Sequence, residues 1–182
     1  YGAQEMVLFP EWQQSGYNRV FAVSQAIQNS QSGDVIIYEM QAYDASNNLL
    51  PAEYDLTVWN LTKAATDAGI IIVEAAANGS LDLDSPTYAS YMNRGNSGAI
   101  LVGAGSSTVN HVKSSFSNYG SRVDVQGWGQ SVFTSGFTGS YITIGGDLNQ
   151  AYTNFAGTSS ATPIVAGCVI VLQSYYRSLT GN

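Results

Sequence analysis

The residues most able to do covalent chemistry stand near the carboxyl terminus, in the string 155–163. This string reads Phe-Ala-Gly-Thr-Ser-Ser-Ala-Thr-Pro and leads into an apolar stretch with helical spacing. A serine in the first turn of a helix lies among unpaired N–H groups at the positive end of the helix dipole, which favour the negative charge formed when a carbonyl is attacked. Ser159 is therefore a candidate nucleophile, although Gly-Thr-Ser by itself is more often an ordinary helix cap.

A second string, residues 70–79, joins a buried-strand pattern to an amide side chain. It reads Ile-Ile-Ile-Val-Glu-Ala-Ala-Ala-Asn-Gly, which places Asn78 directly after an apolar run. A side-chain amide aimed at a developing oxyanion accelerates acyl transfer by roughly 10²–10³. Taken alone, Asn-Gly is more often only a turn that follows a strand.

Together, the two strings resemble the motifs of the subtilisin-like serine peptidases. Gly-Thr-Ser-x-Ala-x-Pro, followed by an apolar helix with small residues, is the nucleophile motif of that family, and residues 157–163 match each of its fixed positions. The resemblance implies a serine endopeptidase that forms an acyl-enzyme on Ser159, with Asn78 as the oxyanion-binding residue. We expect their side chains to lie within about 8 Å of each other, as groups that converge on one reacting centre do.

The resemblance covers nearly the whole chain, from about residue 3 to residue 179. Residues 99–104, leading to 115–125, resemble the structural core that joins the two motifs. The family usually continues with Ala-Pro-Gly, whereas this sequence has Gln-Gly-Trp-Gly at residues 126–129. That departure alters a loop and leaves the proposed chemistry untouched.

The resemblance also implies where a peptide substrate binds. In the family, the peptide pairs with the strand end after the first buried run and with the strand that leads to the oxyanion asparagine. The corresponding positions here are Glu39, Met40, Gln41, Ala75, Ala76 and Ala77. Glu39 and Gln41 depart from the Ser-Leu-Gly that the family often has. Glu39 and Glu74 each close an apolar strand, where a carboxylate is costly unless paired or solvated, so each is either a hydrogen-bonded structural acid or a substrate-facing one.

A serine hydroxyl needs an adjacent general base, commonly a histidine that a carboxylate orients. The one histidine, His111, follows Asn78 in a polar stretch, whereas the family order is Asp, His, Ser. We therefore expect His111 in a surface loop and not as the base. Residues 1–9 resemble the strand after the family's histidine helix, which implies that the Asp and His segments lie upstream. The prediction is a partial peptidase domain over residues 1–182 that is inactive alone.

The elements that must position these residues follow an order typical of an α/β protein. Apolar runs predict buried strands at residues 4–9, 35–40, 70–76 and 98–104. Helical spacing predicts helices at residues 17–29, 54–68 and 158–179. This alternation favours a mostly parallel sheet with helices on its faces, and the resemblance implies the subtilisin-like three-layer form without its amino-terminal strands and histidine-bearing helix. Residues 105–153, rich in Gly, Ser and Thr, predict hairpins and loops.

Composition excludes some classes of partner. Only 10% of the residues are charged, the net charge is −7 and the pI is about 4.3, so the surface would repel phosphate backbones and nucleic acid is excluded. The longest apolar runs fall short of the roughly 20 residues of a membrane span. A surface of uncharged polar residues is compatible with an extracellular or cell-envelope protein. We expect Cys168, on the apolar helix, to be buried.

Partners and cofactors follow from the same reasoning. The expected partner is a polypeptide substrate, together with either the upstream segment or a second copy covering the exposed sheet edge. No cofactor is expected, and the one candidate for calcium is the pair of carboxylates in Asp82-Leu83-Asp84.

Three alternatives to an active endopeptidase remain. A non-catalytic relative would keep the fold for peptide binding. The related sedolisin type shares Gly-Thr-Ser but usually has aspartate as its oxyanion residue, and Asn78 speaks against it. An unrelated sugar- or ligand-binding α/β domain would leave three ordered motif matches as coincidence.

Overall fold

The structure is a computed structural model that describes residues 3, 5–136 and 139–181. At its centre lies a four-stranded sheet with the order β3-β6-β7-β8, and each neighbouring pair is parallel. The strands are β3 (Val35–Tyr38), β6 (Ile71–Ala75), β7 (Ile100–Gly105) and β8 (Val125–Trp128). The apolar, β-branched sequences of β3 and β6 suit a parallel sheet that is covered on both faces.

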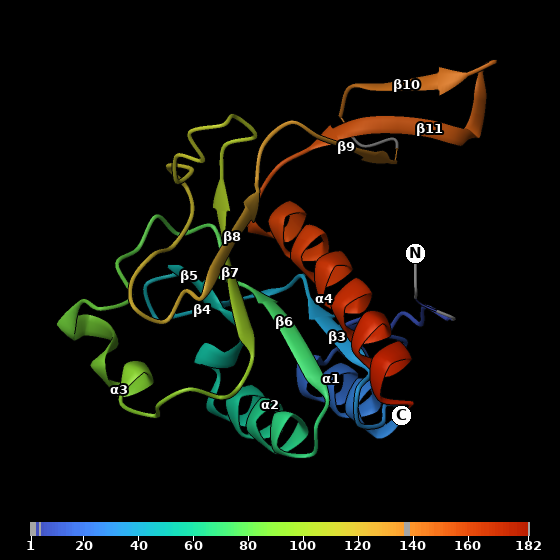
Figure 1. Cartoon of the computed structure of the whole chain (residues 1–182). Coiled ribbons are helices and arrows are strands. Elements are labelled where there is room, and N and C mark those ends of the chain that lie inside the picture. Colours follow the sequence, from blue (N-terminus) through green and yellow to red (C-terminus); the bar gives the residue numbers. More distant parts are fainter. Residues whose placement is uncertain (1–2, 4, 137–138, 182) are drawn as a thin grey trace.

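Helices cover both faces of this sheet, which gives three layers (Figure 1). Helices α1 (Arg19–Gln28) and α2 (Leu56–Asp67) lie on one face, and α4 (Thr158–Thr180) lies on the other. Successive residues of β6 point to opposite faces. Ile72 therefore joins the core cluster shared with α1 and α2, while Val73 joins the cluster shared with α4. The predicted α/β, three-layer arrangement is confirmed.

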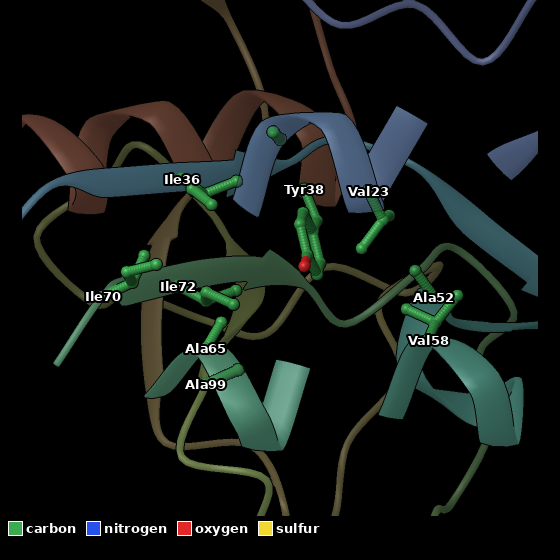
Figure 2. Close-up of a cluster of buried hydrophobic side chains, with 10 residues drawn as sticks. Val23, Ile36, Tyr38, Ala52, Val58, Ala65, Ile70, Ile72 and Ala99 are labelled. Carbon is green, nitrogen blue, oxygen red and sulfur yellow. The ribbon is translucent and has the colours of Figure 1, made fainter. Parts of the chain in front are cut away.

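The core on the α1 and α2 side is built from short aliphatic side chains around one tyrosine. Figure 2 shows Ile36 and Tyr38 of β3 and Ile72 of β6 with Val23 of α1 and Val58 of α2, all buried. Burying one such aliphatic side chain contributes about 1.5–3 kcal/mol to folding. This core fixes the spacing between β3 and β6, whose carboxyl ends lead to the predicted site.

Polar side chains and a glycine set the ends of the helices. Asn18 accepts a hydrogen bond from the Phe21 N–H at 2.9 Å and begins α1, and Asp55 accepts from the Thr57 N–H at 2.7 Å and begins α2. Such caps satisfy N–H groups that have no partner within the helix. Helix α4 ends at Gly181, whose φ of 72° is left-handed.

Smaller elements surround the sheet. They are β1 (Trp12–Gln13), β2 (Gly16–Tyr17), β4 (Gln41–Tyr43), β5 (Leu49–Pro51), the 3₁₀ turns η1 (Ala52–Tyr54) and η2 (Pro86–Tyr88), and α3 (Ala89–Met92). An antiparallel arm of β9 (Val132–Ser135), β10 (Tyr141–Ile144) and β11 (Asp147–Phe155) projects from the body (Figure 1) and leads into α4. The hairpins predicted within residues 105–153 are confirmed.

The strand predicted at residues 4–9 is wrong over the part that the structure describes. Gln4 lies outside the described residues, and residues 5–9 form no strand. Met6 and Leu8 are 95% and 85% exposed. An apolar run becomes a strand only when a neighbouring strand satisfies its backbone N–H and C=O groups, and none of the described residues pairs with it.

The placement of Cys168 is also corrected, because this side chain is exposed. The side of α4 that packs on the sheet carries Ala161 and Ala166, whereas Cys168 shares the outer side with Ile164 and Leu172 at spacings of four residues. The helix is apolar all round, so periodicity alone did not indicate which side is covered. None of the helices in the described part of the chain is long and apolar enough to cross a lipid bilayer.

Candidate active site

Ser159 lies in the first turn of α4, where the arm meets the helix. The Gly157 N–H donates to the Gly129 carbonyl at 2.9 Å, and Gly157 has a φ of 126°, which residues with a Cβ rarely adopt. The half-buried Ser159 donates its hydroxyl to the Glu39 carbonyl at 3.2 Å. Its own N–H has no acceptor among the described residues. The hydroxyl and a free N–H donor therefore stand on one residue at the positive end of α4.

The Asn78 side chain meets α4 at the residue before Ser159. Its Oδ1 accepts from the Thr158 N–H at 2.8 Å and from the Thr158 hydroxyl at 3.0 Å. A backbone N–H can only donate, so the amide oxygen must face Thr158. The Asn78 Nδ2 group points the other way and donates to no protein group within the described residues.

This arrangement can stabilise a negative oxygen beside a nucleophile. Two donors have no acceptor among the described residues. One is the Ser159 N–H, and the other is the Nδ2 group of Asn78, whose side chain is hydrogen-bonded to the residue before Ser159. Donors held in place before the reaction lower the barrier because they need no reorganisation when charge develops. The geometry thus suits attack of a hydroxyl on a carbonyl carbon.

Among the residues predicted to contact substrate, Glu39 and Gln41 reach the site. The Glu39 carbonyl accepts a hydrogen bond from the Ser159 hydroxyl. The Glu39 side chain is exposed, and partial desolvation by neighbouring protein atoms raises the pKa of its carboxyl. The Gln41 side chain accepts from the Asn78 N–H at 3.3 Å, and its carbonyl accepts from Arg19 at 2.7 Å. Both residues therefore connect the end of β3 to the candidate nucleophile and the candidate oxyanion donor.

The other predicted substrate contacts lie deeper in the molecule. Met40 packs against the core cluster on the α1 and α2 side. Ala75, Ala76 and Ala77 are buried, with at most 1% of their surface exposed. Carbonyls of Ala76 and Ala77 already accept hydrogen bonds from Asn118.

The sequence left two roles open for Glu74, a hydrogen-bonded structural acid or a substrate-facing acid, and the structure supports the structural one. Its carboxyl is fully buried and accepts from the Glu53 N–H at 2.8 Å, while its second oxygen has no hydrogen-bond partner in the described part of the chain. Burial, and then the nearby charge of Glu53, raise the pKa of Glu74 well above its usual value. Glu74 is therefore an acid buried inside the protein and does not face a substrate.

Sequence reasoning missed a buried ionic network next to Glu74. The Arg122 guanidinium contacts Glu53 at 2.9 Å and Asp124 at 2.9 Å, and the Tyr91 hydroxyl donates to Glu53 at 2.5 Å. Ser97 also donates to Glu53. In a chain with so few charged residues, Glu53 and Arg122 could have been singled out as candidates for burial, but their pairing across distant segments had no local signal.

His111 lies in the loop between β7 and β8 and is exposed, as predicted. Its carbonyl accepts from Gln126 at 2.7 Å, and the residue lines a shallow hollow with Trp128, Ile164 and Cys168. Within the described residues, the only acceptor for the Ser159 hydroxyl is the Glu39 carbonyl. His111 therefore makes no hydrogen bond with the Ser159 hydroxyl in this arrangement.

The carboxylates suggested for calcium are already engaged with the protein. Asp84 accepts from the Ser121 N–H at 2.8 Å and from the Ser121 hydroxyl at 2.6 Å, and Asp82 accepts from the Asp84 N–H at 3.0 Å. The described part of the chain offers no group of three or more His, Cys, Asp or Glu side chains placed to hold a metal ion. Calcium takes six to eight oxygen ligands, so these residues fit a calcium ion poorly.

Comparison with known proteins places this geometry in context. Residues 6–182 match the model of the subtilase family. An alkaline proteinase from Hapsidospora chrysogena is 35% identical over 141 residues, which cover 78% of this chain and 31% of that protein. An extracellular serine proteinase from Thermus sp. (strain Rt41A) is 34% identical over 116 residues, 64% of this chain and 24% of that protein.

A solved structure shows the same fold. The crystal structure of a cold-adapted subtilisin-like serine proteinase superposes with a TM-score of 0.57 at 22% identity and covers 91% of this chain and 50% of its own. The chain spans between a quarter and a third of the length of the two curated relatives and half of this structure.

Proposed function

The chain belongs to the subtilase family, and from this membership we propose that it is the nucleophile-bearing part of a serine endopeptidase domain. The proposal assigns the general base and its orienting acid to a segment outside these 182 residues. The observation that carries it is the Asn78 amide, whose oxygen accepts from the Thr158 N–H at 2.8 Å and whose Nδ2 group donates to no protein group among the described residues. A helix cap or a turn after a strand does not require that orientation.

The proposed reaction uses the groups described above. The Ser159 hydroxyl oxygen attacks the carbonyl carbon of a peptide bond while the base takes its proton. The carbonyl oxygen becomes negative and accepts hydrogen bonds from the Ser159 N–H and from Asn78 Nδ2. The C–N bond then breaks, the proton passes to the leaving amine, and water hydrolyses the ester on Ser159.

The site of action and the substrate follow from the same membership. The substrate is a polypeptide, and Glu39 and Gln41 are proposed to contact it on the side of β3. Relatives named as extracellular and alkaline proteinases support action outside the cell or in the cell envelope.

A second candidate is a non-catalytic subtilase that binds peptides. The observation in its favour is that the Ser159 hydroxyl donates to the Glu39 carbonyl and contacts no histidine among the described residues. Such a protein would bind peptides equally well with and without the hydroxyl.

The test compares the complete protein with its Ser159→Ala variant in peptide hydrolysis. The expected loss in kcat is about 2 × 10⁶, the effect of removing the nucleophile in this same family. A serine-directed phosphonate should inactivate the unchanged protein and leave the variant unlabelled. Ser178→Ala, an exposed serine at the far end of α4, is the matched control. Equal peptide binding without hydrolysis by the unchanged protein and the Ser159→Ala variant would instead establish the non-catalytic alternative.

A further inference from the structure

The turn that carries Asn78 has an unfavourable backbone conformation. Ala77 and Ser80 have φ values of 72° and 59°, in the left-handed region that residues with a Cβ avoid. Between them, Gly79 is pressed so closely against β5 that an added Cβ would lie 2.3 Å from the Leu49 carbonyl. Such a conformation persists only where the surrounding structure holds it.

The side chain that holds this turn is Asn118, which is 1% exposed. Its Nδ2 group donates to the Leu49 carbonyl at 2.9 Å and to the Ala76 carbonyl at 2.7 Å. Its Oδ1 accepts from the Gly79 N–H at 3.0 Å and from the Leu81 N–H at 2.9 Å. All four hydrogen-bonding positions of the amide are thus used on the segments before, within and after the turn.

The backbone of Asn118 is itself fixed to the central sheet. Its N–H donates to the Ala77 carbonyl at 3.1 Å. Its carbonyl accepts from the Ser117 hydroxyl at 2.9 Å, and that hydroxyl accepts from the Ala104 N–H of β7 at 2.9 Å. The turn is therefore connected through Asn118 to a strand that contributes no residue to the site.

We propose that Asn118 is a positioning residue that sets the direction of the Asn78 amide. This inference rests on the proposed function, because Asn78 matters only if an oxyanion forms. Asn118 touches neither substrate nor Ser159 and acts through the turn. Thr158 orients the Asn78 oxygen from one side, and Asn118 fixes the backbone from which the side chain extends.

Displacement of the Asn78 amide is expected to change kcat and not KM. The oxyanion exists in the transition state and not in the bound substrate, so a displaced Asn78 amide weakens transition-state binding alone. Replacing Asn118 by alanine removes the acceptor for two partly buried N–H groups, those of Gly79 and Leu81, and releases the turn. We expect kcat to fall while KM stays nearly constant.

The experiment is a double-mutant cycle in the complete protein, measured well below the melting temperature. Asn78→Ala is expected to lower kcat about 10²–10³-fold. Asn118→Ala is expected to lower kcat at least about 10-fold, and the double variant to be no slower than Asn78→Ala, because both act through one interaction. The matched control is Ser114→Ala, since Ser114 is also buried, at 2% exposure, but its hydroxyl has no hydrogen-bond partner among the described residues.

A structural role alone would give a different result. Asn118→Ala would then lower the melting temperature with kcat unchanged, or its loss of kcat would multiply with that of Asn78→Ala, and either outcome overturns the proposal. If Asn118→Ala does not fold, the nearly isosteric Asn118→Asp carries the test, because it sets a carboxylate oxygen against the Leu49 and Ala76 carbonyls; an unchanged kcat in that variant also overturns it. Failure of the proposed function is recognised separately, by hydrolysis that survives Ser159→Ala.

Discussion

Thr158 supplies both hydrogen bonds that orient the Asn78 amide, one from its backbone and one from its hydroxyl. The two can be separated, because Thr158→Val keeps the backbone N–H and the branched shape and removes only the hydroxyl. A neutral hydrogen bond contributes about 0.5–1.5 kcal/mol, so we expect kcat of the complete protein to fall about 2- to 10-fold at constant KM. Thr180→Val, at the other end of α4, is the control. A rise in KM without loss of kcat would contradict the assignment.

Glu74 makes stability depend on pH. Its carboxyl is buried, and its pKa is raised from the ordinary 4.5, first by burial and then by Glu53. The folded state therefore holds a proton that the unfolded chain releases above pH 4.5. This contribution to stability is complete below pH 4.5 and is lost as the pH rises toward the raised pKa, by at most about 1.4 kcal/mol per pH unit.

The matched comparison for Glu74 is Glu74→Gln, which has nearly the same shape and does not titrate. The other ionisable groups around it, Glu53, Tyr91 and Arg122, are common to both proteins. We expect the free energy of unfolding of the unchanged protein to fall relative to the variant as the pH rises above 4.5, in urea titrations at several pH values. A difference that does not vary with pH would show that Glu74 is ionised in the folded protein.

At this scale, sequence reasoning singled out candidate residues that belong to contiguous strings and did not indicate those joined only by folding. Ser159 and Asn78 each stand in a motif whose neighbours identify it. Asn118 and Arg122 act on partners many positions away, Leu49 and Glu53, and no local pattern relates them. The direction of the Asn78 amide also required the structure, because it depends on a single N–H of Thr158.

At the scale of elements, the contact between β8 and α4 leaves no room for a side chain. A Cβ added to Gly127 would lie 2.6 Å from the Ala161 carbonyl, and both groups belong to backbone that cannot move independently. We expect Gly127→Ala to destabilise the protein by about 1–3 kcal/mol, as overpacking does. Urea titration or thermal melting measures this loss.

Gly167 on the same helix gives a control of opposite sign. An added Cβ there meets no atom within 4 Å among the described residues. In the 182-residue chain, Gly167→Ala should therefore stabilise α4 by about 0.5–1 kcal/mol, the ordinary advantage of alanine over glycine within a helix. Similar effects of the two substitutions would contradict the close contact between β8 and α4 at Gly127.

Elements were predicted well where periodicity and packing agree. Residues 70–76 and 158–179 became β6 and α4 with ends shifted by a residue or so. Residues 5–9 failed as a strand because pairing is not a local property. Cys168 was misplaced because a helix that is apolar all round does not indicate which side meets the sheet.

At the scale of the whole molecule, one apolar surface and one strand edge stand uncovered by the described residues. One is the outer side of α4, formed by exposed Ile164, Val171, Leu172, Tyr175, Tyr176 and Leu179. The other is the free edge of β3, which pairs only with β6 in the described part of the chain. Contiguous apolar surface and open strand edges promote association, so we predict that the 182-residue chain self-associates or binds a segment from outside it.

Sedimentation velocity tests this prediction. Leu172→Lys combined with Tyr175→Lys should shift the 182-residue chain toward monomer, whereas Val109→Lys, at an exposed loop position, should not. A stable, monodisperse monomer of the unchanged chain would contradict the prediction and indicate that these surfaces need no cover.

We expect the peptidase activity of the 182-residue chain to depend on the rest of the domain. Without a base, Ser159 keeps its hydroxyl proton, and only Asn78, the helix terminus and substrate binding remain to stabilise the transition state. Loss of the base in this family leaves roughly 10³–10⁴-fold acceleration over water and costs about 2 × 10⁶ in kcat. We therefore expect the 182-residue chain to be nearly inert in peptide hydrolysis, and the protein extended upstream to be active and sensitive to Ser159→Ala. If the chain alone cleaved peptides at the rate of the extended protein, a missing histidine would not be required. Glu39, whose carbonyl already contacts the Ser159 hydroxyl and whose exposed carboxyl has a raised pKa, would then become the candidate base.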